Sequence, residues 1–438
     1  MARMRSLVIA AVCSFLAQGS LVAAGKADQV PLNAGHDSEI EYESIEGLGN
    51  FASNLTAGWL GGVGWYEPKL CSKGYCVFAN RGIANGRGMA MVTTSTHMQK
   101  IRRLEPVLAQ PGTNGHFDTS KPPPYEEKDI PGRGIVLVAN QTLKRGDRLM
   151  AWSPVLIVHK NFYEEVPPDD QTSLLAAAVA LLPDATRAKF TRQVRTANAI
   201  KSRDIRDIVR KHSFEVNLGY RFAPGESDNE KHSVAYPEVT SLLHDCRPNL
   251  SYHIGGVYVH HTTVARKILP GEELTMSYVS PFGSRAERQH WVHEWKGTGC
   301  TCMQCHGGAT GDLGAIAKSD ARLQEIQDIE KLLKEHTSRG VTTEMIARLV
   351  ELYKEERLHY RLADMYELVA INYNNLGYAK RAKKYALLSA QAGAVERGPD
   401  ANDIIALRIL ADDPEGHYSY RMRLPKSKTG SKEKSGGK

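Results

Sequence analysis

The chain has 438 residues, of which 42% are hydrophobic and 24% are charged. This composition excludes disordered and fibrous proteins, and the length is enough for about two or three domains. The formal net charge is +7, but residues 421–438 hold seven Lys or Arg against one Glu. The rest of the chain is nearly neutral, so the charge indicates no direct nucleic-acid site. We expect residues 416–438, rich in Lys, Ser and Gly, to form a basic disordered tail.

Residues 1–24 have the pattern of a secretory signal peptide. Its three parts are a positive start at Arg3 and Arg5, an apolar stretch from Leu7 to Leu16, and small residues at Val22 and Ala24. A cleaved signal would place the protein in the secretory pathway or outside the cell. If these residues instead form an N-terminal helix, we expect the protein in the nucleus or cytoplasm. No later segment is long and apolar enough to predict a membrane span after cleavage.

Residues 25–124 predict loops and a hairpin. The hairpin strands are expected at Tyr75 to Ala79 and Gly88 to Thr93, each bounded by Gly or Asn. Cys71 and Cys76 lie five residues apart, where either a small disulfide loop or two free thiols are feasible. The Pro-rich stretch Lys121–Pro124 predicts a linker, so we expect a new domain to begin at residue 125.

The region 125–280 predicts a mixed α+β domain. Its strands are expected at Ile135 to Ala139, Arg148 to Ala151, Val155 to His159, Tyr252 to His260, Thr263 to Lys267 and Leu274 to Tyr278. Between them, apolar residues at spacings of three and four predict a helical insertion at about 160–235.

The region 315–415 predicts a helical C-terminal domain. Leu323, Ile326 and Ile329 form one apolar stripe, and a second follows from Ile346 to Tyr353. The run from Ala370 to Gly393 resembles one helix-turn-helix repeat of the tetratricopeptide (TPR) type, although such arrays usually need about three repeats.

Three separated segments carry the residues for one chemistry. The first is Pro131-Gly132-Arg133-Gly134-Ile135, whose glycines permit close backbone approach to a ligand but by themselves are typical of a plain turn. The second is Leu243-His244-Asp245-Cys246-Arg247-Pro248-Asn249, and the third is Gly271-Glu272-Glu273-Leu274-Thr275-Met276-Ser277-Tyr278, followed by Cys300, Cys302 and Cys305. Over about residues 128–305, this order and spacing resemble the SET-domain family of protein lysine methyltransferases.

The resemblance implies a SET-type β-clip of short, curved sheets and a pocket for S-adenosylmethionine. Gly132, Arg133 and Gly134 would line the cofactor, and His244 and Asn249 would form the floor of its pocket. Tyr278 would be the catalytic residue, at the channel where methyl donor and substrate lysine meet; otherwise it merely closes a strand. The expected substrate is a lysine-containing protein such as a histone.

The resemblance also implies a structural zinc site in a post-SET segment at 281–306. Cys300, Cys302 and Cys305 have ligand-like spacing, but structural zinc needs four ligands. In the family, the cysteine of the His-x-Cys motif, here Cys246, completes the set. Disulfides remain the alternative if the chain matures in an oxidising compartment.

Other features of the layout resemble fungal SET-domain proteins with an inserted core. The 160–235 insertion has no cysteine, which excludes an inserted MYND-type zinc finger there. The family usually has Asn where this chain has Leu243, and losing a polar contact to the cofactor would weaken its binding by about 1 to 3 kcal/mol. Two functions therefore stay open: a protein-lysine methyltransferase, or a catalytically inactive SET scaffold that binds a protein partner through its helical C-terminal region.

Overall fold

Residues 64–424 are described by the computed structural model, except 67–69, 103–114, 117–120, 132, 193–204, 218–230, 256–257, 309–310 and 336–337. All described residues belong to one of two compact units, residues 38–438. The signal-like segment 1–24, Gly132 and residues 425–438 lie outside the described residues, and the expectations for them stay predictions.

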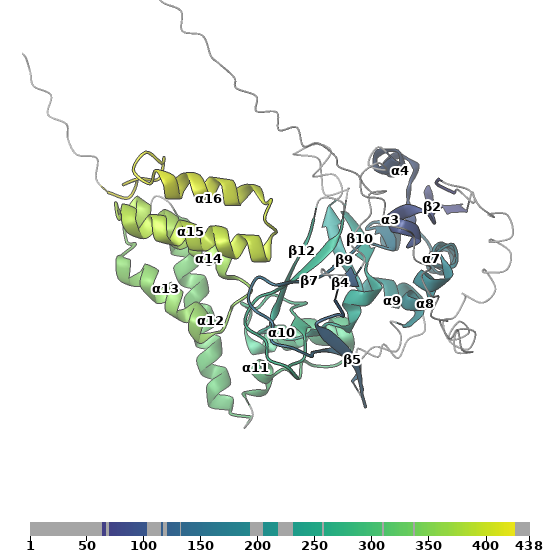
Figure 1. Ribbon diagram of the computed structural model, residues 1–438, viewed down its shortest axis with the longest axis horizontal. Coiled ribbons are helices and arrows are strands. Elements are labelled where there is room, and N and C mark those ends of the chain that lie inside the picture. Colours follow the sequence, from purple (N-terminus) through teal and green to yellow (C-terminus); the bar gives the residue numbers. More distant parts are fainter. Residues whose placement is uncertain are drawn as a thin grey trace, which may run out of the picture. The chain divides into compact units, whose positions relative to one another are not determined.

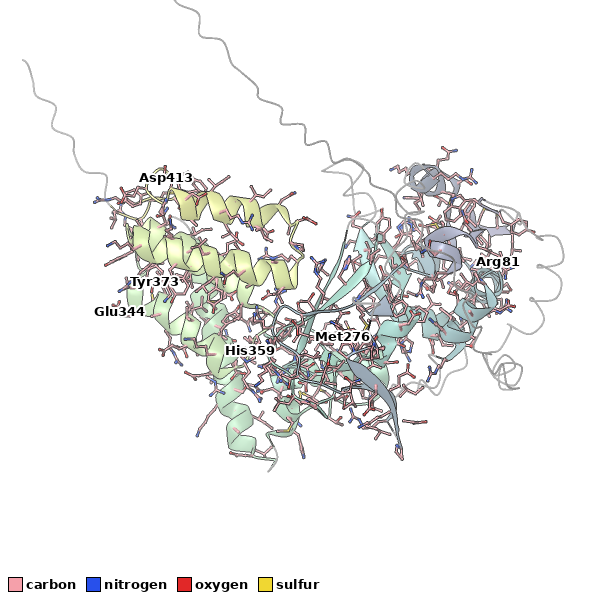
Figure 2. All side chains as sticks on the ribbon, viewed as in Figure 1. Arg81, Met276, Glu344, His359, Tyr373 and Asp413 are labelled. Carbon is pink, nitrogen blue, oxygen red and sulfur yellow. A yellow bond between two sulfur atoms is a disulfide. The ribbon has the colours of Figure 1, made fainter. Side chains whose placement is uncertain are left out.

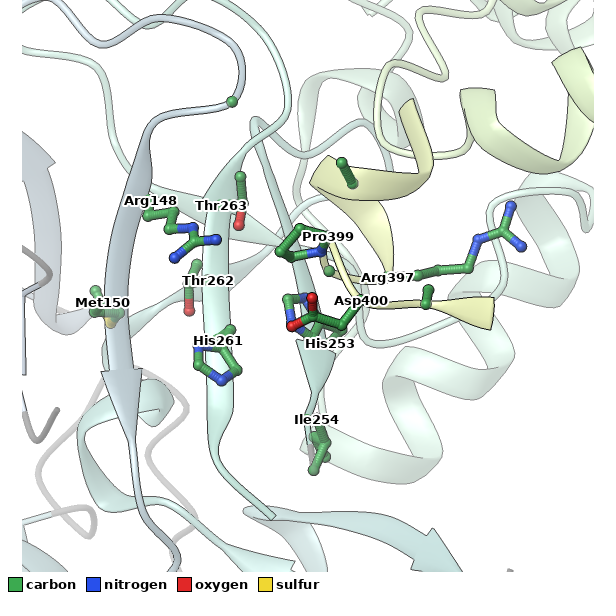
Figure 3. A pocket seen from close by; sticks show the side chains of 15 residues that line it. Arg148, Met150, His253, Ile254, His261, Thr262, Thr263, Arg397, Pro399 and Asp400 are labelled. Atoms are coloured by element: carbon green, nitrogen blue, oxygen red, sulfur yellow. The ribbon is translucent and has the colours of Figure 1, made fainter. Parts of the chain in front are cut away.

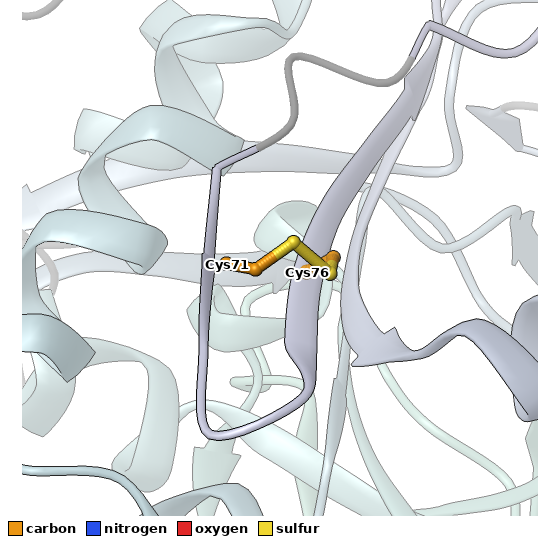
Figure 4. The surroundings of a disulfide bond; sticks show 2 residues. All are labelled: Cys71 and Cys76. Atoms are coloured by element: carbon orange, nitrogen blue, oxygen red, sulfur yellow. A yellow bond between two sulfur atoms is a disulfide. The ribbon is translucent and has the colours of Figure 1, made fainter.

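The largest sheet has six strands in the order β1-β2-β3-β8-β10-β9 (Figure 1). They are β1 (Cys71–Ser72), β2 (Tyr75–Asn80), β3 (Met89–Thr94), β8 (Leu156–His159), β10 (Lys231–Ala235) and β9 (Ser213–Asn217). The expected hairpin is present, since β2 and β3 are antiparallel and connected through the short α3 (Ile83–Gly86). Cys71 and Cys76 form a disulfide across the β1–β2 turn (Figure 4).

This sheet corrects the domain start expected at residue 125. β3 pairs in parallel with β8, so strands from both sides of the Pro-rich stretch share one hydrogen-bonded sheet. The Pro-rich stretch therefore connects parts of a single sheet structure. Its prolines signal a local linker but carry no information on which distant strands pair.

Two hydrophobic cores lie on opposite faces of the sheet, because successive strand side chains point to opposite sides. Val77, Val92 and Val158 pack against the insertion helices. These are α6 (Phe162–Glu165), α7 (Pro168–Ala180), α8 (Asp184–Arg192) and α9 (Ile205–Lys211). The helical insertion at 160–235 is thus only partly as expected, since its described residues after α9 form strands β9 and β10.

The opposite face shares its core with smaller sheets that carry the motif segments. A four-stranded sheet has the order β12-β13-β7-β4. Its strands are β12 (Leu250–Ile254), β13 (His260–Val264), β7 (Arg148–Trp152) and β4 (Gly115–His116). Two further pairs are the antiparallel β5 (Tyr125–Ile130) with β6 (Gly134–Ala139), and the parallel β11 (Leu243–His244) with β14 (Thr275–Met276).

After β14 the described chain is mostly helical, as expected (Figure 1). The helices are α10 (Arg285–Lys296), α11 (Met303–His306), α12 (Leu313–Lys334), α13 (Thr343–Glu355), α14 (Leu362–Asn375), α15 (Ala379–Glu396) and α16 (Asn402–Asp412). The two apolar stripes from the sequence meet in one core of α12, α13 and α14. A TPR-type arrangement stays a prediction. Among the described residues, no helix has the length and apolar character needed to cross a membrane.

The expected tail is wrong for residues 416–424, which pack on the helical region. Arg423 is only 7% exposed, and its guanidinium donates to the Leu333 carbonyl at 2.9 Å and the Asn372 amide oxygen at 3.1 Å. The Arg421 N–H donates to the Asn374 carbonyl at 3.0 Å. Carbonyls at the C-terminal end of a helix lack partners within it, so a nearby Arg can become buried by satisfying them.

Candidate functional site

The second and third motif segments lie side by side. β11 pairs in parallel with β14, which places Leu243 opposite Thr275 and His244 opposite Met276, a buried residue labelled in Figure 2. Asn249 joins the same two segments through its side-chain amide. Its Nδ2 donates to the Glu273 carbonyl at 2.8 Å, and its Oδ1 accepts from the Thr275 N–H at 2.9 Å.

The first motif segment reaches the third. The Arg133 guanidinium pairs with the Glu273 carboxylate at 2.8 Å, and the Leu274 N–H donates to the Leu137 carbonyl at 2.8 Å. Gly134 begins β6 with φ +71°, a left-handed conformation that favours glycine. Arg133 and Gly134 therefore lie next to the segment that leads to Tyr278.

His244 connects Tyr278 to the cysteines. Its Nδ1 accepts the Tyr278 N–H at 3.1 Å, and its Nε2 lies 3.3 Å from the Cys246 sulfur. The rings of His244 and Tyr278 stack with centroids 5.5 Å apart. The Tyr278 hydroxyl donates to the Leu242 carbonyl. Backbone, ring and hydroxyl of Tyr278 are thus all fixed by the residues around the His-x-Cys motif.

Tyr278 borders two hollows. One, about 200 Å³, is lined by residues 211–215, Val239, Thr240, Tyr252, Tyr278 and Trp295. We call it the aromatic cavity after the rings of Phe214, Tyr252, Tyr278 and Trp295. The other, about 480 Å³, is the helical-side cleft. Its walls are residues 250–252 and 277–282 together with Tyr360, Arg361, Asp364, Glu396 and Arg397 of the helical region. Tyr252 and Tyr278 line both hollows.

The walls of the aromatic cavity are fixed by ring contacts. Trp295 meets the Tyr278 ring edge-on at 4.4 Å, and Phe214 lies 5.2 Å from Tyr252. Behind them His260 is fully buried and stacks on Tyr252 at 5.0 Å. Burial lowers the pKa of His260 to about 3, so this imidazole is neutral at physiological pH. Lys211 and Glu215 also line the cavity, so its walls combine uncharged rings with two charged side chains.

Four cysteines form a cluster beside this site, as expected. The sulfurs of Cys246, Cys300, Cys302 and Cys305 lie within 4.8 Å of one another, with Cys246 3.9 Å from Cys300 and 3.5 Å from Cys305. Zn–S bonds of about 2.3 Å in a tetrahedron require sulfurs about 3.8 Å apart, so the donor set fits a zinc ion. Hydrogen bonding to Cys300, Cys302 and Cys305, together with burial, raises the pKa of the Cys246 thiol.

Arg288 lies against the cysteine cluster and is only 1% exposed. Its Nη2 is 4.0 Å from the Cys305 sulfur, and Nη1 donates to the Gly283 carbonyl. Burial alone would lower the pKa of Arg288, but the negative charge of Cys246 and Cys305 raises it. A tetrathiolate zinc site carries two excess negative charges, which a neighbouring guanidinium partly offsets.

A buried ion pair ties the second motif to the helical region. Arg247 donates to the Glu356 carboxylate at 2.6 Å and to the Cys246 carbonyl at 2.7 Å. Glu356 also accepts from Ser319 at 2.8 Å and from Arg322 at 2.6 Å. The side chains of Arg247 and Glu356 are 3% and 1% exposed. A second link runs from Arg145 to the carbonyl of His359, labelled in Figure 2, at 2.7 Å.

Comparison with known proteins agrees with this geometry. Residues 134–279 match the family model of the SET domain. We call this stretch the SET region; it holds all of the His-x-Cys motif and ends one residue after Tyr278. A SET and MYND domain-containing protein of Dictyostelium discoideum is 32% identical over 68 residues. That alignment covers 15% of this chain and spans 20% of the relative.

Sequence reasoning located the motif residues but missed the aromatic walls. Phe214 comes from β9 and Tyr252 from β12, neither of which carries a catalytic motif. Glu356, 109 residues beyond Arg247, was also missed. One signal was available in the sequence: an Arg inside a buried motif requires an anionic or carbonyl partner, although the sequence does not say which.

Proposed function

We propose that this protein is a SET-domain methyltransferase that uses S-adenosylmethionine to methylate a lysine of a protein substrate. One observation supports it above others. Tyr278 borders both the aromatic cavity and the helical-side cleft, and it is held by the Leu242 carbonyl and by His244. This is the arrangement needed when donor and acceptor approach one reaction point from two sides.

The aromatic cavity suits the cationic groups of this reaction. S-adenosylmethionine supplies a sulfonium methyl group, and the substrate supplies a lysine ammonium. Faces of Tyr and Trp attract cations, and Tyr252, Tyr278 and Trp295 offer three such rings. Arg133, 47% exposed beside Gly134, is placed to meet an anionic group of the cofactor.

The side chains of His244 and Asn249 contribute mainly by holding the segments in place. Both amide atoms of Asn249 bond the backbone of the third segment, and His244 bonds Tyr278 and Cys246. In the proposed pocket the cofactor therefore meets the main chain of the second motif. Leu243, packed with Val136 and Val138 in an apolar cluster, adds no polar contact from its side chain.

The chain's own residues must also help the substrate lysine lose its proton. A lysine with an ordinary pKa near 10.4 pays roughly 4 kcal/mol to be neutral near pH 7.4. The aromatic rings beside Tyr278 would lower that cost by desolvating the ammonium. The hydroxyl of Tyr278, already oriented on the Leu242 carbonyl, then positions the neutral amine.

We further propose that the four cysteines hold a structural zinc ion. The ion would hold the chain around Cys300–Cys305 against Cys246. It would thereby also hold Trp295, which precedes these ligands, against the Tyr278 ring.

If the SET region does not bind the cofactor, the second candidate function remains. In that case the protein is a scaffold that binds a protein partner through its helical region. Leu243 is the residue that favours it.

Calorimetric titration with S-adenosylmethionine separates the two functions. The methyltransferase requires saturable binding, followed by transfer of tritium from methyl-labelled cofactor to lysine in histone H3 and H4. Tyr278→Phe, which keeps the ring contacts, should retain binding and lose most of the transfer. If the wild-type chain binds no cofactor at millimolar concentration, the enzyme proposal fails and the scaffold remains.

A further inference from the structure

Three tripeptides in the sequence match the acceptor pattern for an N-linked glycan, which is Asn, any residue except Pro, and then Ser or Thr. They begin at Asn54, Asn140 and Asn249. Asn54 lies outside the described residues. The other two lie in the SET region, and they differ in burial and in what their side-chain amides bond.

The acceptor tripeptide Asn140-Gln141-Thr142 is exposed at all three residues, in the connection that follows β6. Both flanking residues are buried and bonded. The Ala139 N–H donates to the Glu272 carbonyl at 2.9 Å, and the Leu143 N–H donates to the Ile268 carbonyl at 2.9 Å. The tripeptide therefore stands at the surface between two fixed points, and a glycan on it displaces nothing from the core.

The side-chain amide of Asn140 can carry a sugar without losing its present contact. Its Nδ2 donates to the Pro123 carbonyl at 3.0 Å. An amide nitrogen has two hydrogens, and glycosylation replaces one of them. The remaining N–H still donates to Pro123, and the backbone N–H of Asn140 keeps its own bond to the Pro124 carbonyl at 3.2 Å. The folded loop thus fits the modified residue as well as the unmodified one.

Asn249 is the opposite case and serves as an internal control. It is 2% exposed, and its Nδ2 and Oδ1 both bond the segment before Tyr278. A sugar on Nδ2 would need space that this segment occupies. Folded molecules should therefore carry no glycan at Asn249, although the local sequence matches the same pattern.

We propose that Asn140 carries an N-linked glycan, attached as the chain passes through the secretory pathway. In this step Nδ2 forms a bond to C1 of the first sugar, the bond from C1 to a lipid pyrophosphate breaks, and Nδ2 gives up one proton as the lipid pyrophosphate leaves. Two features support entry into that pathway. Residues 1–24 have the pattern of a signal peptide, and Cys71–Cys76 is a disulfide, a bond that persists in oxidising compartments. The proposal does not depend on methyl transfer.

The glycan would leave the proposed site open. A strand rises about 3.3 Å per residue, so Asn140 lies about 20 Å along β6 from Gly134 at its start. Residues 140–142 line neither the aromatic cavity nor the helical-side cleft. They do not line a third pocket either, which measures about 470 Å³ and has His253 and His261 in its walls (Figure 3). Removing the glycan should therefore leave cofactor binding unchanged.

The full 438-residue chain, expressed in a eukaryotic host, tests the proposal site by site. Peptide N-glycosidase in heavy-oxygen water converts each glycosylated Asn to a heavy-oxygen-labelled Asp, which peptide mass spectrometry then locates. Asn140 should be labelled in most molecules and Asn249 in none. Purified protein with unlabelled Asn140 would overturn the proposal, and label at Asn249 in folded protein would contradict the role given to burial.

Two substitutions of Thr142 form a matched pair that leaves Asn140 in place. Thr142→Ser keeps the acceptor pattern, and Thr142→Ala removes it. The intact mass should show the loss of one glycan in Thr142→Ala only, and equal glycan masses for the two variants would contradict the proposal. Calorimetry with S-adenosylmethionine should give one affinity for the wild type and both variants. Failure of all three to bind would refute the methyltransferase and leave the glycan result standing.

Discussion

Removing the charge of Glu356 should destabilise the protein strongly. Glu356 and Arg247 are 1% and 3% exposed, so the substitution Glu356→Gln leaves a guanidinium buried without its counter-charge. Burial acts to raise the pKa of Glu356, but its bonds to Arg247 and Arg322 hold that pKa below its ordinary value. The carboxylate is therefore ionised at neutral pH, and its loss is a loss of charge.

The expected cost is about 3 to 5 kcal/mol, the range for breaking one side of a buried ion pair. A value near the lower end is expected because glutamine keeps an oxygen that can accept from Ser319 or Arg322. The adjacent Glu355 is the matched control. It is 44% exposed and pairs with Arg348 at 2.9 Å, so Glu355→Gln should cost at most about 1 kcal/mol.

Guanidinium chloride unfolding followed by circular dichroism measures both variants. A double variant, Arg247→Met with Glu356→Leu, adds a second check. Replacing a whole buried pair by apolar groups is often close to neutral, so the double variant should be more stable than Glu356→Gln. If the free energies of unfolding of Glu356→Gln and Glu355→Gln differ by less than about 1 kcal/mol, the Arg247–Glu356 ion pair does not hold the helical region to the second motif.

Three further changes have measurable outcomes. Tyr278→Phe should lower kcat for lysine methylation about 100-fold, while the cofactor affinity measured by calorimetry should not change. A kcat equal to that of the wild type would show that the Tyr278 hydroxyl takes no part in the chemistry. Purified protein should contain about one zinc ion per chain by mass spectrometry, and Cys246→Ser should release it to a chelator that leaves the wild type loaded. The pKa of His260 is lowered to about 3, so the unfolded chain takes up a proton below pH 6.5 that the folded chain does not. The free energy of unfolding of the wild type should fall by about 2 kcal/mol between pH 6.5 and pH 5, and that of His260→Phe should fall by less. An identical pH dependence in the two proteins would contradict this prediction.

The sequence by itself determined the chemistry-bearing segments. The motifs around Gly134, His244 and Tyr278 and the four cysteines were identified from their order and spacing, and the structure brings all of the described ones together. The apolar stripes of the C-terminal region also predicted its helices, which share one core in the structure. These features depend on local patterns, which repeat every three to four residues or within a short motif.

Only the tertiary structure decided which distant segments meet. β3 pairs with β8, which begins at Leu156, 67 residues after the start of β3 at Met89. This pairing joins segments on both sides of the expected domain start. Arg423 is buried against α12 although it sits in a basic, Ser-rich end of the chain. Glu356 completes the site around Arg247, and Tyr252 completes the aromatic cavity. Strand pairing and burial of charged groups depend on partners that are far away in sequence, and no local pattern specifies those partners.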